Sequence, residues 1–113
     1  MKKVDKISLA ELTEKSKKMY DPMVKAVVDI QQKLLVVDAE MHVDEEQMLL
    51  ENGSKQADLW GCNLYPAEFG TDKFIVYDSM INIRPRQNNR SRTIESEEIR
   101  AQVDAIVKEI VHE

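Results

Sequence analysis

Two neighbouring runs of aliphatic residues constrain the fold of this chain more than any other feature. They read "MVKAVVDI" (23–30) and "KLLVVDAEMHV" (33–43), and only Gln31 and Gln32 stand between them. Dense Val, Ile and Leu favour extended strands, and so short a connection joins antiparallel neighbours. The sequence therefore predicts a β-hairpin with its turn near these two glutamines.

The second run alternates, and its polar face carries a candidate metal site. Leu35 and Val37 begin a face that stays apolar as far as Val43 and is predicted to face the core. On the opposite face neighbouring side chains stand roughly 6 to 7 Å apart, so two of them can reach one cation. The candidate ligands of a divalent metal are Asp38, Glu40 and His42.

The alternative is a solvated strand face whose last member, Asp44, caps the following helix. Apart from the divalent metal, the sequence indicates no cofactor.

Capping signals mark the first two predicted helices. A capping box begins at Ser8 and predicts a helix over residues 9–20. A second begins at Asp44 and predicts a short helix over residues 45–52. Gly53 then suits the left-handed residue that follows many helix ends.

A third, longer helix is predicted to begin near Glu95. Its acidic first turn suits the positive end of the helix dipole. Apolar residues recur at helical spacing and form one stripe that is expected to pack on the core: Ile99, Val103, Ile106, Val107 and Ile110.

A second pair of strands is expected in the middle of the chain. The segments are "DLWGCNLYP" (58–66) and "KFIVYDSMINIRP" (73–85), with "AEFGTD" (67–72) as their loop. Asn63 and Asn82 fall inside these strands, where an amide needs a partner, and cross-strand pairing of the two is the favoured interpretation.

The predicted element order is α-ββ-α-ββ-α, which indicates an α+β fold. We expect a single domain over residues 1–113, with about four strands in one antiparallel or mixed sheet. The helices are expected to pack on one face of that sheet.

Charge is segregated along the chain, whose formal net charge is -5. Residues 34–54 contain no Lys or Arg, and residues 79–94 contain no Asp or Glu. Net acidity argues against a general binder of nucleic acids or membrane surfaces. No apolar run reaches the ~18 residues that span a bilayer, and the N-terminal residues do not form a signal peptide, so a cytoplasmic location is expected.

The basic segment, residues 79–94, is the main candidate binding site. It holds four of the five arginines and leads into the N-terminus of the last helix, where free backbone N–H groups favour an anion. Guanidinium forks and amide donors suit a phosphate-bearing ligand, a nucleic acid or an acidic protein surface. The candidate residues are Asn82, Arg84, Arg86, Asn88, Asn89, Arg90, Ser91 and Arg92. The alternative is that these arginines pair with the protein's own carboxylates.

Two other functions are kept open by the residues alone. A small nuclease-like hydrolase can use His42 as the acid or base, with the arginines holding a phosphate. A homodimer can place the acidic strand of one copy against the basic loop of the other. A non-catalytic binding module is the preferred hypothesis.

The segments "VDAEMHVDEEQMLLENGSKQADLWGCNLYP" (37–66) and "DSMINIRPRQNNRSR" (78–92) resemble a family of small prokaryotic proteins known as a domain of unknown function. The resemblance covers most of the chain and implies a single compact α+β domain. It implies no activity and no catalytic residue.

Overall fold

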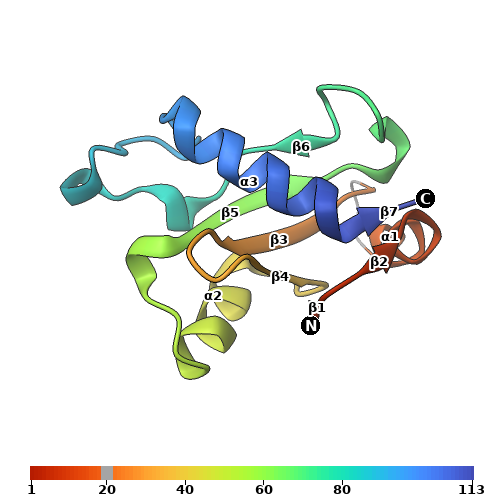
Figure 1. The fold of residues 1–113 in the computed structure, drawn as a ribbon, viewed down its shortest axis with the longest axis horizontal. Coiled ribbons are helices and arrows are strands. Elements are labelled where there is room, and N and C mark those ends of the chain that lie inside the picture. The colour runs from red at the N-terminus through yellow and green to blue at the C-terminus, as the bar shows by residue number, and fades with distance from the viewer. Residues whose placement is uncertain (19–21) are drawn as a thin grey trace.

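The computed structural model describes residues 1–18 and 22–113, and the predicted hairpin lies at its centre (Figure 1). Strands β3 (Val24–Asp29) and β4 (Leu34–Val37) pair antiparallel, with Val27 opposite Val36. Strand β5 (Leu59–Leu64) pairs antiparallel with the other side of β3. The hairpin prediction is therefore confirmed, and β3 is the central strand.

Short strands complete the sheets. The five-stranded antiparallel sheet has the order β1-β4-β3-β5-β6, and a two-stranded parallel sheet joins β2 to β7. The outer strands and the helices are β1 (Lys2–Val4), β2 (Ile7–Ser8), α1 (Leu9–Ser16), α2 (His42–Glu51), β6 (Ile75–Val76), α3 (Glu97–Ile110) and β7 (Val111–His112). The α+β class is confirmed. The sheet has one strand more than expected because residues 2–4 add an edge strand.

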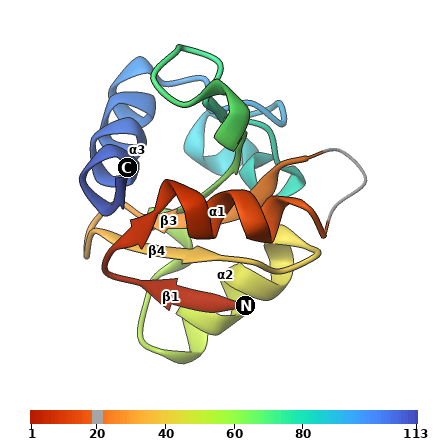
Figure 2. The same ribbon diagram turned by 90° about the vertical axis from the view of Figure 1, so that its right-hand side faces the viewer.

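The helices cover both faces of the sheet, so their expected placement on one face is wrong. Figure 2 shows α3 above and α2 below the strands. One core lies beneath α1 and α3 and contains alternate strand residues such as Val28, Leu35 and Trp60. The residues between them, including Val27 and Val36, pack with α2 in a second core. Consecutive aliphatic residues in both strands make the two faces apolar, and each face needs its own cover.

Strand β4 ends six residues earlier than predicted. Asp38 follows its last residue with a φ of 71°, a left-handed conformation that breaks the strand. Helix α2 then begins at His42, so Asp44 lies in its first turn and is not the cap. Gly53 follows the helix with a φ of 97°, as predicted.

The predicted strand over residues 73–85 is wrong beyond Val76. Two 3₁₀ helices replace it, Met80–Asn82 and Pro85–Gln87. This segment approaches β5 at Gly61, where a Cβ atom would lie 2.6 Å from the Cβ of Ser79. A glycine is therefore required here, and the segment closes the edge of the sheet without itself being a strand.

The first helix follows its predicted capping signal, and the last helix has a cap that was not predicted. The Ser8 hydroxyl accepts from the Glu11 N–H at 3.1 Å at the start of α1, which ends at Ser16. Residues 19–20, the end of that predicted helix, lie outside the described residues. The Ser96 hydroxyl caps α3, and the predicted apolar stripe of this helix packs on the core. No helix in the described parts of the chain is long and apolar enough to cross a bilayer.

Candidate functional site

The basic segment is built into the edge of β5, and Asn82 is its most buried member. The Asn82 Oδ1 accepts from the Gly61 N–H at 2.9 Å, while its Nδ2 donates to the carbonyls of Gly61 and Arg92, both at 3.0 Å. The side-chain amide thus pairs with Gly61 as a peptide group of a neighbouring strand would. The predicted pairing with Asn63 is wrong, because the Asn63 Nδ2 donates to the Asp78 carbonyl.

Arg84 is also buried and bonded to the protein's own backbone. Its guanidinium lies 4.5 Å from the centre of the Trp60 ring and 3.9 Å from the Glu46 carboxylate. Burial lowers its pKa, and Glu46 opposes that effect. The guanidinium donates to three carbonyl oxygens, which belong to Gln56, Leu59 and Ile81. Arg84 thus joins three separate backbone segments at the start of β5.

Asn89 organises the rest of the loop from the inside. It exchanges backbone hydrogen bonds with Arg84, and its Oδ1 accepts from the Glu95 N–H at 2.8 Å. Its Nδ2 donates to three more carbonyls, those of Asn82, Ser91 and Thr93. Asn88, with a φ of 59°, makes the tight turn just before it.

A carboxylate of the chain itself binds backbone amides of the basic loop, while the N-terminus of α3 is capped by the Ser96 hydroxyl. One oxygen of Glu95 accepts from the N–H groups of Arg90 and Ser91 and from the Ser91 hydroxyl, at 2.8 to 2.9 Å. The Ser91 hydroxyl and the Arg90 N–H lower the Glu95 pKa, in that order. Arg92 pairs with Asp78 at 2.9 Å. Anion binding by this loop stays a prediction, and its exposed arginines without an ion pair in the described residues are Arg86 and Arg90.

The three predicted metal ligands do not come together. Asp38 pairs with Lys15 at 3.1 Å and with Lys18 at 3.2 Å. Burial alone would raise the pKa of Asp38, but the hydrogen bonds and positive charges of these two lysines outweigh it, so the pKa is lowered. Glu40 is exposed, whereas His42 is buried at the start of α2. Within residues 1–18 and 22–113, no group of three His, Cys, Asp or Glu side chains is arranged to hold a metal ion. The early end of β4 removes the shared strand face that the prediction required.

His42 and Arg84 hydrogen-bond to different carbonyls of β5. The His42 Nε2 lies 2.8 Å from the Cys62 carbonyl, to which it donates. Burial is the main cause of a lowered His42 pKa, so the ring is neutral near pH 7. Arg84 binds the carbonyl of Leu59, three residues along the same strand and roughly 10 Å away at the usual rise per residue. The geometry gives no support to a hydrolytic centre built from these two side chains.

Glu45 is a buried carboxyl that the sequence analysis missed. Its Oε2 accepts from the Ala39 N–H at 3.2 Å, and its Oε1 has no hydrogen-bond partner among the residues that the structure describes. Burial raises its pKa to about 9, so it is protonated at neutral pH. The available signal was spacing, because Glu45 stands three residues after His42 and four before Leu49, both of which are buried.

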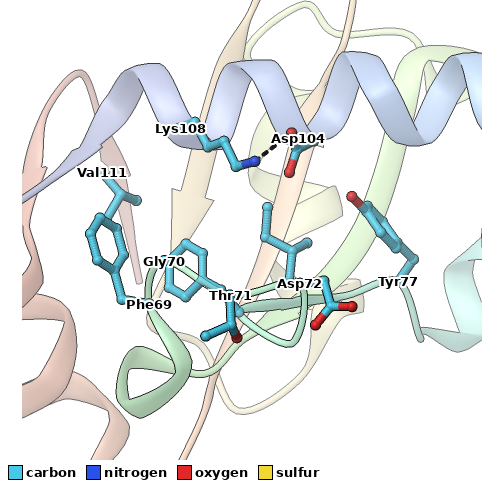
Figure 3. Close-up of a pocket in the computed structure, with 10 residues that line it drawn as sticks. Phe69, Gly70, Thr71, Asp72, Tyr77, Asp104, Lys108 and Val111 are labelled. Carbon is cyan, nitrogen blue, oxygen red and sulfur yellow. Dashed lines mark ion pairs between the residues drawn. The ribbon is translucent and has the colours of Figure 1, made fainter.

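A pocket of about 630 Å³ lies between residues 69–77 and α3 (Figure 3). We call it the α3 pocket. Phe69 and Phe74 meet edge to face, with ring centres 5.1 Å apart. The lining also contains Ile75 and Val111, together with five polar side chains: Thr71, Asp72, Tyr77, Asp104 and Lys108.

The polar groups of the α3 pocket are unequally paired. Lys108 and Asp104 form an ion pair at 3.0 Å, and the Tyr77 hydroxyl donates to the Arg100 carbonyl at 3.4 Å. Burial first, and then Asp104, raises the pKa of Tyr77 to about 12. Asp72 has no hydrogen bond or ion pair within the described residues. The sequence predicted a connecting loop over residues 67–72 and a strand from residue 73, and gave no sign of the pocket.

The fold and the site define a small α+β protein with an aromatic pocket beside its last helix. Residues 3–110 of the 113-residue chain match the model of a family described as "Protein of unknown function (DUF5674)". The chain belongs to this family, which agrees with the resemblance to a domain of unknown function. Comparisons with curated proteins and with solved structures found no match.

Arg84, which precedes the 3₁₀ helix Pro85–Gln87, and Arg86, which lies within it, provide a matched test of the structural role of the segment. Arg84→Gln should lower the free energy of unfolding by about 3 kcal/mol, because several buried carbonyls lose their donor. Arg86→Gln removes an exposed charge and should cost no more than about 0.5 kcal/mol. Urea unfolding measures both, and equal losses would contradict the assignment.

Glu45 predicts a pH dependence of stability. Its pKa is about 9 in the folded protein and near 4.5 when unfolded, so the folded state holds the proton more tightly. The contribution of Glu45 to stability should therefore be largest below the lower value and fall between the two, by up to about 1.4 kcal/mol per pH unit. Glu45→Gln should remove this fall.

Unfolding of both proteins between pH 5 and 8 measures the effect. The advantage of the Glu45→Gln variant should grow with pH. An exposed replacement on the same helix, Glu51→Gln, serves as the control. A constant difference between the Glu45 variant and the parent protein would show that Glu45 does not titrate in this way.

Proposed function

We propose that this protein is a non-catalytic binding module whose ligand is a small organic molecule held in the α3 pocket. The observation that carries the proposal is the pocket itself. Its volume of about 630 Å³ lies within the ~300–1,000 Å³ typical of small-molecule sites. Such sites combine apolar and aromatic walls with a few polar groups that orient the ligand. The α3 pocket has this composition.

The state of the polar groups supports binding over catalysis. A general acid or base works best with a pKa near the operating pH. The pKa of Tyr77, about 12, is far above neutrality, and its hydroxyl already donates to a carbonyl. The Lys108 ammonium pairs with Asp104. These groups can orient a ligand without exchanging protons with it.

The proposal is tested with three phenyl compounds of similar size, namely 2-phenylethanol, phenethylamine and 3-phenylpropionate. At least one should give saturable shifts of the backbone amide resonances of Gly70, Thr71 and Ile75 in ¹H–¹⁵N spectra. Phe69→Ala removes part of the aromatic wall and should weaken binding about tenfold, since burial of aromatic area is lost.

The matched control is Met80→Ala, which removes an exposed apolar side chain from another part of the surface. It should leave the affinity unchanged. If none of the three compounds shifts these amides at millimolar concentration, the α3 pocket is not a small-molecule site and the proposal fails.

A second candidate function is binding of a phosphate-bearing ligand or nucleic acid at the basic loop. It is supported by the exposed Arg86 and Arg90, whose guanidinium groups have no ion pair within the described residues. Arg92 adds a third, partly exposed guanidinium that is paired with Asp78. An external polyanion would bind Arg86 and Arg90 directly and would compete with Asp78 for Arg92.

This candidate is tested with a 20-nucleotide single-stranded DNA by fluorescence anisotropy at increasing salt concentration. Binding should weaken steeply with salt, and Arg90→Gln should weaken it and shallow the slope of the logarithm of affinity by about one. Lys33→Gln, an exposed charge in the β3–β4 turn, is the control. Absence of binding at low salt would exclude nucleic acid as the partner of this loop.

A further inference from the structure

The charges of the α3 pocket favour a positively charged ligand. Two carboxylates, Asp72 and Asp104, line the pocket against a single ammonium group, that of Lys108. They come from opposite sides, since Asp72 lies on the connecting loop and Asp104 on α3, as Figure 3 shows. A ligand that enters between the loop and the helix therefore meets a net negative charge.

The cation already present in the pocket is weakly held. Lys108 is four residues after Asp104 on the same helix, and its side chain remains 65% exposed. Exposed ion pairs of this spacing contribute little, because water screens them and the long side chain loses freedom. The Lys108 ammonium can swing into solvent when another cation reaches Asp104.

Asp72 is the second carboxylate and has no competing partner in the described residues. It is exposed, so its charge is solvated and no internal cation needs to leave before it meets a ligand. Asp104 and Asp72 thus offer one occupied and one open position for positive charge.

The apolar part of the pocket is aromatic, which also suits a cation. Phe69 and Phe74, which meet edge to face, both line the pocket, and Tyr77 adds a third ring to its wall. The negative face of an aromatic ring attracts an ammonium group at short range. The same rings bury the apolar body to which the charge is attached.

From these contacts we infer that the ligand of the α3 pocket is an organic amine, a cation carried on an apolar body. The ammonium group lies between Asp104 and Asp72, where it replaces the Lys108 ammonium. The body packs against Phe69 and Phe74. This inference rests on the proposed function, because it names the class of molecule that the pocket takes.

The experiment compares the affinities of phenethylamine, 2-phenylethanol and 3-phenylpropionate for the full chain at pH 7, measured by the same amide shifts. Phenethylamine should bind most tightly and 3-phenylpropionate most weakly. Asp72→Asn and Asp104→Asn should each weaken phenethylamine about two- to fivefold, the usual range for one exposed charge contact. Neither change should alter the affinity for 2-phenylethanol.

Lys108→Gln gives the sharpest result, because it removes the competing ammonium. Phenethylamine should then bind more tightly, by about two- to fivefold. Lys55→Gln makes the same change in net charge on an exposed residue that does not line the pocket, and it should have no such effect. Thermal unfolding shows whether each variant is folded.

The outcomes separate this inference from the function on which it rests. If 2-phenylethanol shifts the pocket amides and phenethylamine binds no more tightly, the pocket takes neutral molecules and the amine inference is overturned alone. If 3-phenylpropionate binds best and Lys108→Gln weakens it, the ligand is an anion held by Lys108. If no compound binds, both the inference and the proposed function fail.

Discussion

The outer edge of β5 is the constraint on which the second half of the molecule depends. A strand with a free edge leaves N–H and C=O groups that must be satisfied. Strand β6 pairs with only the last two residues of β5, Asn63 and Leu64. Toward the start of β5, the Asn82 amide pairs with both backbone groups of Gly61, and Arg84 donates to the Leu59 carbonyl. Side chains thus continue the ladder where the neighbouring strand ends.

The contacts at this edge account for two of the four arginines in the basic segment, Arg84 and Arg92. Arg84 is needed for carbonyls that no strand reaches, and Glu46 lies near enough to offset its charge. Arg92 forms an ion pair with Asp78, and the Glu95 carboxylate accepts from the backbone N–H groups of Arg90 and Ser91. These exposed contacts also stabilise the segment. Much of the positive charge that marks this region in the sequence is therefore balanced within the fold. Arg86 and Arg90 have no ion pair within the described parts of the chain, and the anion-binding hypothesis rests on them.

The α3 pocket lies where the chain that precedes the β5 edge contacts faces helix α3. Once Ser79 and Asn82 are anchored on Gly61, the chain continues to Glu95 and α3 crosses the opposite face of the sheet. The connection before β6 then faces this helix, with Phe74 in the core and Asp72 at the surface. A cavity with an aromatic wall and charged rim results from two segments about thirty residues apart in sequence.

The sequence by itself determined those features that depend on residues close together along the chain. The capping hydroxyl of Ser8, the left-handed Gly53 and the apolar stripe of α3 act over a few residues, so local patterns predict them. The β3–β4 hairpin is local as well. The tertiary structure alone decided that Asp38 ends β4, that Asn82 pairs with Gly61 and that Phe69 and Asp104 share a pocket. These contacts join residues far apart in sequence, and their energy exists only when the whole chain has packed.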